Sequence, residues 1–124
     1  MSNAGGVSIP LMRFCAGELR CGLVAAAVER LEEPQHNCIQ VCDLLGIARA
    51  LGTEKRTLHL SAYGRQARFI VDGPTALTAI GGTDLIPTGR SLKWPRKGPI
   101  LGFAKDAEHI VLLLDVAWLI ERAS

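Results

Sequence analysis

Hydrophobic and polar positions alternate along much of the chain, in short runs that are separated by turn residues. A hairpin is predicted over residues 12–23, where the alternation breaks at Ala16-Gly17-Glu18 and then resumes. Residues 24–32 fit either a short helix or an extended edge, and Pro34 ends them. The chain therefore begins with β structure.

The middle of the chain has the two-residue period of strands with one buried face. Leu58, Leu60 and Ala62 share one face of a predicted strand. Further strands are predicted at residues 67–71, 75–80 and 100–104, with turns at Gly64-Arg65-Gln66 and Asp72-Gly73-Pro74. Short strands and tight turns with few helices are typical of small β-barrels.

Two apolar strands each lead into an aspartate and then into a helical pattern. Asp43 follows a predicted strand at 38–42, and Asp115 follows one at 110–114. The apolar residues after them recur at the spacing of a core-facing helix. They match at an offset of 72 residues: Leu44, Ile47, Ala48 and Leu51 in the first helix, and Val116, Leu119, Ile120 and Ala123 in the second. This repeat predicts two similar β units, each finished by strand, aspartate and helix.

Asp43 and Asp115 are interpreted as helix caps. An aspartate at a helix start accepts hydrogen bonds from unpaired backbone N–H groups and lies favourably in the helix dipole. General acid–base catalysis would need a partner acid and a pocket, and the sequence indicates neither. We therefore expect a protein that is not an enzyme and uses no cofactor.

Length, charge and hydropathy narrow the class of protein. The 124 residues predict one domain over 7–124, and residues 1–6 are set aside as a disordered, cloning-derived segment. The net charge of +2 is too small to imply a polyanionic partner. No apolar run approaches the roughly 18 residues that span a bilayer, so a cytoplasmic protein is expected.

The four cysteines raise the question of a metal site. Cys38 and Cys42 are separated by three residues, but Cys15 and Cys21 are separated by five across a turn, unlike the tight pairs of structural zinc sites. A site that also uses His36 is the alternative. We expect the cysteines to be small core residues, with no bound metal.

A basic loop at residues 90–97 contains one aromatic residue. Its side chains are Arg90, Lys93, Trp94, Arg96 and Lys97. A nucleic-acid surface needs basic residues interleaved with several stacking aromatics, and the whole chain has only six. The loop is either solvated or binds an acidic protein, with Trp94 as its anchor, because tryptophan is enriched at binding hot spots.

Four segments in order resemble the CheW-like domains, the coupling proteins of chemotaxis. They are "LRCGLVAAAVERLEEP" (19–34), "CIQVCDLLGI" (38–47), "RFIVDGPTAL" (68–77) and "ILGFAKDAEHIVLLLDVAWLIE" (100–121). The resemblance implies a mainly β fold of two SH3-like barrel subdomains that share a hydrophobic core, with short helices. It also implies a scaffold that binds the regulatory domain of a CheA-like histidine kinase and joins it to chemoreceptors.

One departure from that family falls in the first half of the chain. The family's Asn-x-Arg-Gly segment is missing, because only Gln35-His36-Asn37 separates Pro34 from Cys38. The shorter first barrel would leave a strand edge exposed, and such an edge can pair with another chain. We therefore hypothesise that this form dimerises through that edge.

The sequence thus favours an adaptor that binds a histidine kinase. Arg65 and Arg68, which flank the predicted hairpin, and Trp94, Arg96 and Lys97 are its predicted protein-interaction residues. The alternatives are a β-barrel that binds nucleic acid through residues 90–97, and a cysteine-based metal or redox protein.

Overall fold

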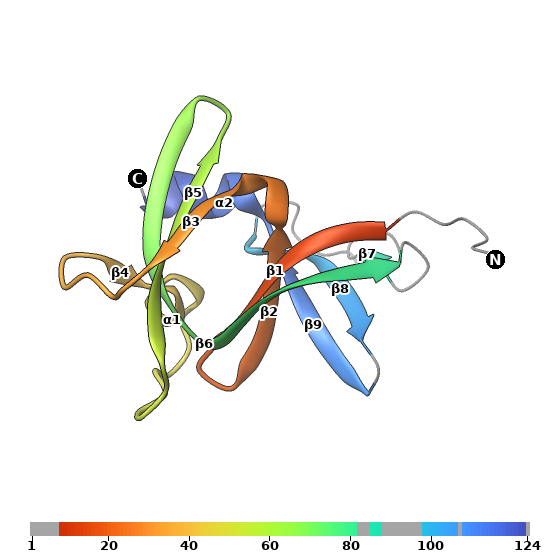
Figure 1. Ribbon diagram of the computed structural model, residues 1–124, viewed down its shortest axis with the longest axis horizontal. Coiled ribbons are helices and arrows are strands. Elements are labelled where there is room, and N and C mark those ends of the chain that lie inside the picture. Colours follow the sequence, from red (N-terminus) through yellow and green to blue (C-terminus); the bar gives the residue numbers. More distant parts are fainter. Residues whose placement is uncertain (1–7, 82–84, 88–97, 107, 124) are drawn as a thin grey trace.

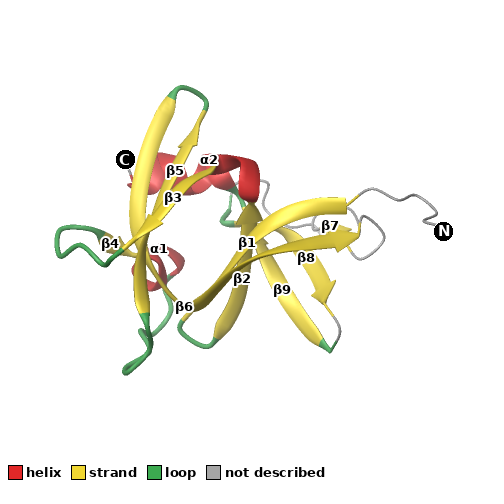
Figure 2. Cartoon of the chain, in the orientation of Figure 1, coloured by secondary structure: helices red, strands yellow, loops and turns green. Residues whose placement is uncertain are grey.

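The chain is described by a computed structural model that covers residues 8–81, 85–87, 98–106 and 108–123. Strands dominate these residues, and the predicted mainly β fold with short helices is confirmed (Figure 1 and Figure 2). The elements are β1 (Ser8–Ala16), β2 (Leu19–Val24), a 3-10 turn η1 (Ala25–Ala27), β3 (Val28–Glu32), β4 (Ile39–Gln40), α1 (Val41–Leu45), β5 (Lys55–Ala62), β6 (Arg65–Gly81), β7 (Leu85–Pro87), β8 (Ile100–Asp106), β9 (His109–Leu114) and α2 (Val116–Ala123).

The strands form one hydrogen-bonded path in the order β3-β5-β6-β1-β2-β9-β8-β7, and β4 also pairs with β6. β6 is 17 residues long, and its first part pairs with β5 while its second part pairs with β1. Figure 1 shows β6 running from the hairpin with β5 across to the half of the molecule that holds β8 and β9. The two predicted units are therefore joined by a common strand. In the part of the chain that the structure describes, the path stays open between β3 and β7.

Two hydrophobic clusters lie on opposite faces of β1. Met12 and Phe14 belong to the larger cluster, and Leu11 belongs to the smaller. This division follows from the alternation of side chains along a strand. The larger cluster includes Leu58, Leu60, Phe69, Val71, Leu119 and Ile120, and the smaller includes Ile80, Ala104 and Val111.

The turn predicted at Asp72-Gly73-Pro74 is wrong, because β6 continues through it. The carboxylate of Asp72 is 2% exposed and accepts hydrogen bonds from the Gly17 N–H and the Thr53 hydroxyl, both at 2.8 Å. It also forms an ion pair with Lys55. These bonds tie the predicted turn residues to two other segments, so the chain bends there without reversing.

The helix predicted after Asp43 is shorter than its apolar pattern suggested. It spans Val41–Leu45 and ends at Gly46, whose φ of 72° is readily adopted only by glycine. Leu51, placed in the core by the pattern, is 96% exposed. The predicted strand at residues 38–42 is reduced to the two residues of β4, and residues 24–32 contain both η1 and the edge strand β3.

None of the helices in the described residues is long and apolar enough to span a bilayer.

Candidate functional site

The predicted interaction residues divide between described and undescribed parts of the chain. Arg65 and Arg68 are both exposed in β6, in the hairpin with β5, and Arg68 lies on the same strand face as Gln66. The basic loop, including Trp94, Arg96 and Lys97, lies outside the described residues, so its predicted role stays a prediction. The candidate site is therefore built from the outer face of β3, β5 and β6.

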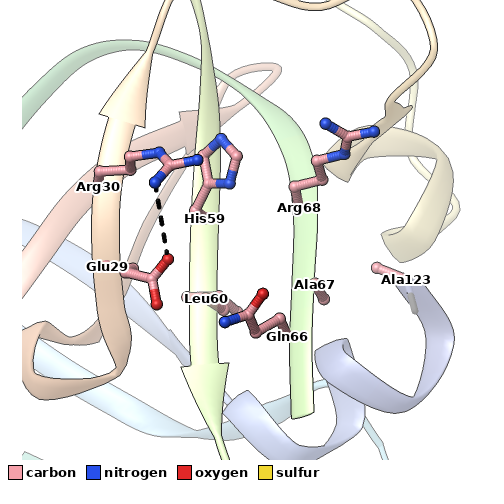
Figure 3. Close-up of a pocket in the computed structure, with 8 residues that line it drawn as sticks. All are labelled: Glu29, Arg30, His59, Leu60, Gln66, Ala67, Arg68 and Ala123. Carbon is pink, nitrogen blue, oxygen red and sulfur yellow. Dashed lines mark ion pairs between the residues drawn. The ribbon is translucent and has the colours of Figure 1, made fainter.

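The register of these three strands places a row of basic side chains, Arg30, His59 and Arg68, on that face. His59 of β5 lies opposite Arg30 of β3 on one side and opposite Arg68 of β6 on the other. Figure 3 shows the three side chains next to one another across the strands. Cβ atoms of directly opposed residues are only about 5 Å apart, so His59 is a close neighbour of both arginines.

Acidic and amide side chains hold this row in position. Arg30 Nε lies 3.3 Å from Glu32 Oε2 and its Nη1 lies 3.9 Å from Glu29 Oε1. Arg68 Nη1 donates to Gln35 Oε1 at 2.7 Å. Since both arginines already contact an acidic or amide side chain, their guanidinium groups are held in position before a partner binds.

Glu32 is the acid that contacts two members of the row. His59 Nε2 lies 2.5 Å from Glu32 Oε1. Desolvation on its own would raise the pKa of Glu32, but the contacts with His59 and Arg30 outweigh it and lower that pKa. Glu32 therefore stays ionised beside these two basic side chains.

A hollow of ≈ 360 Å³ lies beside the row, lined by Glu29, Arg30, His59, Gln66, Arg68 and Ala123 (Figure 3). Its walls come from three strands and from the C-terminal end of α2. A hollow with this lining offers hydrogen-bond donors and acceptors to a partner surface. Arg68 was predicted from its place in the hairpin, whereas Arg30 and His59 were missed.

The two aspartates predicted as caps differ in the structure. Asp115 precedes α2, and its Oδ1 accepts the N–H groups of Ala117 at 2.9 Å and Trp118 at 3.3 Å. Asp43 lies inside α1, where Gln40 occupies the cap position and makes no side-chain cap hydrogen bond. The cap prediction for Asp43 is therefore wrong. The predicted repeat of strand, aspartate and helix is also inexact, because α1 begins two residues before Asp43 whereas α2 begins one residue after Asp115.

The Asp43 side chain instead binds Arg49, which lies beyond the end of α1. Arg49 Nε and Nη2 donate to the two carboxylate oxygens at 3.1 and 2.5 Å. This bidentate pairing lowers the pKa of Asp43. Both side chains are exposed, so the pair lies at the surface.

The four cysteines are all free thiols. Cys21 and Cys42 are buried in the larger cluster, whereas Cys15 and Cys38 are half-buried. In the described ranges, no three His, Cys, Asp or Glu side chains come together as metal ligands could.

Comparison with known proteins gives a result for the fold. The chain matches the crystal structure of the scaffolding protein TtCheW from Thermoanaerobacter tengcongensis with a TM-score of 0.69 and 16% sequence identity. The match covers 89% of this chain and 90% of that one. The chain has the CheW fold. Its sequence matches no family model and no curated protein.

Proposed function

We propose that the protein is a non-enzymatic adaptor in a chemotaxis-type two-component system. It binds the regulatory domain of a CheA-like histidine kinase in the cytoplasm and couples that domain to chemoreceptors. The observation that carries this proposal is the likeness in fold to a scaffolding protein over 89% of the chain. The order of the four sequence segments that resemble CheW-like domains supports it independently.

The row of basic side chains on β3, β5 and β6 (Arg30, His59 and Arg68) is the docking surface in this proposal. Arginine is enriched at binding hot spots, and the guanidinium groups of Arg30 and Arg68 are held in place before a partner arrives. Preorganisation reduces the entropy that is lost when a side chain is ordered on binding. Arg68 is the better residue to test, because its described partner is the neutral Gln35.

The decisive experiment is calorimetric titration of the full chain with the regulatory domain of a CheA-like histidine kinase. We expect binding that does not require ATP, and about tenfold weaker affinity for Arg68→Gln, since loss of a charged hydrogen bond at an interface costs over 1 kcal/mol. Arg49→Gln is the matched control, because Arg49 is also an exposed, hydrogen-bonded arginine but lies in the loop after α1.

Two results would count against the proposal. Absence of binding between the wild-type chain and the regulatory domain would remove the adaptor function. Equal affinities for the wild type, Arg68→Gln and Arg49→Gln would keep the function but move the docking surface elsewhere.

A further inference from the structure

Among the described residues, no strand pairs with one edge of β6 over residues 74–81. β5 and β1 both reach β6 at Asp72, and they flank it on opposite sides. β1 then continues along β6 to Gly81, but the register of β5 stops at Asp72. The Gly73 N–H still donates to the Glu54 carbonyl oxygen, at 2.7 Å. Beyond Gly73, no strand in the described residues pairs with this side of β6.

This open edge lacks the charges that usually protect one. Residues 74–81 read "PTALTAIG" and contain no charged side chain, and Leu77 is 69% exposed. The edge strand β3 at the end of the path carries Glu29, Arg30 and Glu32 within five residues. Charges on an edge discourage strand addition, so β3 is protected and the second half of β6 is open to it.

A hollow of ≈ 350 Å³ lies on one face of this same edge strand. Ala76 and Thr78 of β6 line it together with Arg13 and Arg20 from the first hairpin. Ala76 lies directly opposite Arg13 in the register, and its methyl group leaves room above β6. A strand added at the edge would therefore point alternate side chains toward the hollow, across small residues.

Polar groups in the hollow define which side chain would fit. The Thr78 hydroxyl is buried and has no hydrogen-bond partner among the described residues. Arg20 is exposed and forms no ion pair among them, whereas Arg13 pairs with Asp106. Glu18 also lines the hollow and disfavours a second carboxylate near itself. An acceptor that reaches Thr78 and Arg20 would satisfy a buried donor and a free cation together.

We propose that the open edge of β6 binds an extended segment of a partner protein as an added strand. An aspartate or glutamate of that segment enters the hollow, where it accepts hydrogen bonds from Arg20 and from the Thr78 hydroxyl. Main-chain bonds to residues 76–81 supply affinity, and the acidic side chain supplies selectivity. This surface is separate from the row of basic side chains on β3, β5 and β6, so the strand-addition proposal does not depend on the proposed kinase binding.

The test is selection of random peptides of about ten residues, a usual strand length, on the full chain. We expect enriched peptides to have β-branched residues and one acid on the same face. Hydrogen exchange with a selected peptide should show new protection of backbone amides within residues 76–81, because strand addition pairs them. Replacing the peptide acid by its amide should weaken binding about tenfold.

Two variants make the test specific to this edge. Leu77→Lys places a charge on it and should abolish peptide binding, whereas Ile110→Lys, at a similarly exposed apolar residue of β9, should leave binding unchanged. Arg20→Gln should weaken binding of the acidic peptide about tenfold and leave binding of the amide peptide unchanged, because only the acidic peptide forms an ion pair with Arg20.

Several outcomes would overturn the proposal. They are failure to enrich any peptide, binding that survives Leu77→Lys, and enriched peptides that lack an acid. If light scattering shows a dimer that Leu77→Lys dissociates, the occupant of the edge is a second copy of the chain, and the assignment to a partner segment is wrong.

Discussion

The carboxylate of Asp72 receives three donors from two segments: Gly17 in the first hairpin, and Thr53 and Lys55 around the start of β5. Burial on its own would raise the pKa of Asp72, but these hydrogen bonds and the Lys55 charge outweigh it and lower that pKa. A carboxyl group with a lowered folded-state pKa stabilises the fold above its unfolded pKa of about 3.9. That contribution is lost as the pH falls through the folded-state value.

Asp72→Asn should therefore destabilise the protein by about 3 kcal/mol at pH 7, because it leaves Lys55 without its buried counter-charge. In urea titrations, the difference between wild type and variant should shrink as the pH falls below about 4, where Asp72 is protonated first in the unfolded state and then, at lower pH, in the folded state. Asp43→Asn, at an exposed acid, is the control. A difference that stays constant down to pH 2 would show that the charge of Asp72 contributes nothing.

The thiols should differ in reactivity according to their surroundings. Burial raises the pKa of Cys21 to about 12, and burial followed by the neighbouring Asp72 carboxylate raises the pKa of Cys42. Since the thiolate is the reactive form, neither should be alkylated in the folded protein. Mass spectrometry after brief maleimide treatment should find the label on half-buried Cys38 first. Early labelling of Cys21 would contradict the packing described here.

At the scale of elements, the two helices differ in how their ends are stabilised. α2 begins at an aspartate whose side chain accepts two backbone N–H groups, and α1 is one short turn that ends at Gly46. Asp115→Ala should cost about 1 kcal/mol in the free energy of unfolding, because it leaves the first N–H groups of α2 unpaired. Asp43→Ala should remain close to wild type, since it removes only an exposed ion pair. Equal losses in urea titrations would contradict this assignment.

Local patterns predicted most strands, because alternation of apolar residues is a property of neighbours in sequence. The hairpin at residues 12–23 and the strands of β5, β8 and β9 were predicted in this way. Asp72-Gly73-Pro74 has the composition of a turn, and only contacts with distant Gly17 and Lys55 account for its place within β6. Likewise, the apolar stripe that ends at Leu51 overstated α1, because left-handed Gly46 interrupts it.

The candidate site was predicted only in part for a similar reason. Arg68 was found because it flanks a recognisable hairpin, but the row with Arg30 and His59 depends on the register between three strands. A single sequence specifies the face of each strand more strongly than the pairing between strands. The polar alternation of Thr57, His59 and Ser61 was the available signal that His59 lies on the face opposite Leu58 and Leu60.

At the scale of the molecule, β6 makes the two hydrophobic clusters parts of one structure. Phe69 packs in the larger cluster and Ile80 in the smaller, on the same strand. Urea unfolding followed by tryptophan fluorescence and by far-ultraviolet circular dichroism should therefore give one coincident transition. Two separated transitions would mean that the halves fold independently. Ile80→Ala should shift the single midpoint and lose about 3 kcal/mol without splitting it.

β1 has a consequence for attempts to divide this protein. Its nine residues supply side chains to both clusters, Phe14 to one and Leu11 to the other. A fragment that keeps β1 would expose one apolar face of it to water, and the complementary fragment would lack a wall of its own cluster. Neither fragment of a protein split next to β1 should therefore fold by itself. The two fragments should fold only on binding each other, because only then are both faces of β1 covered.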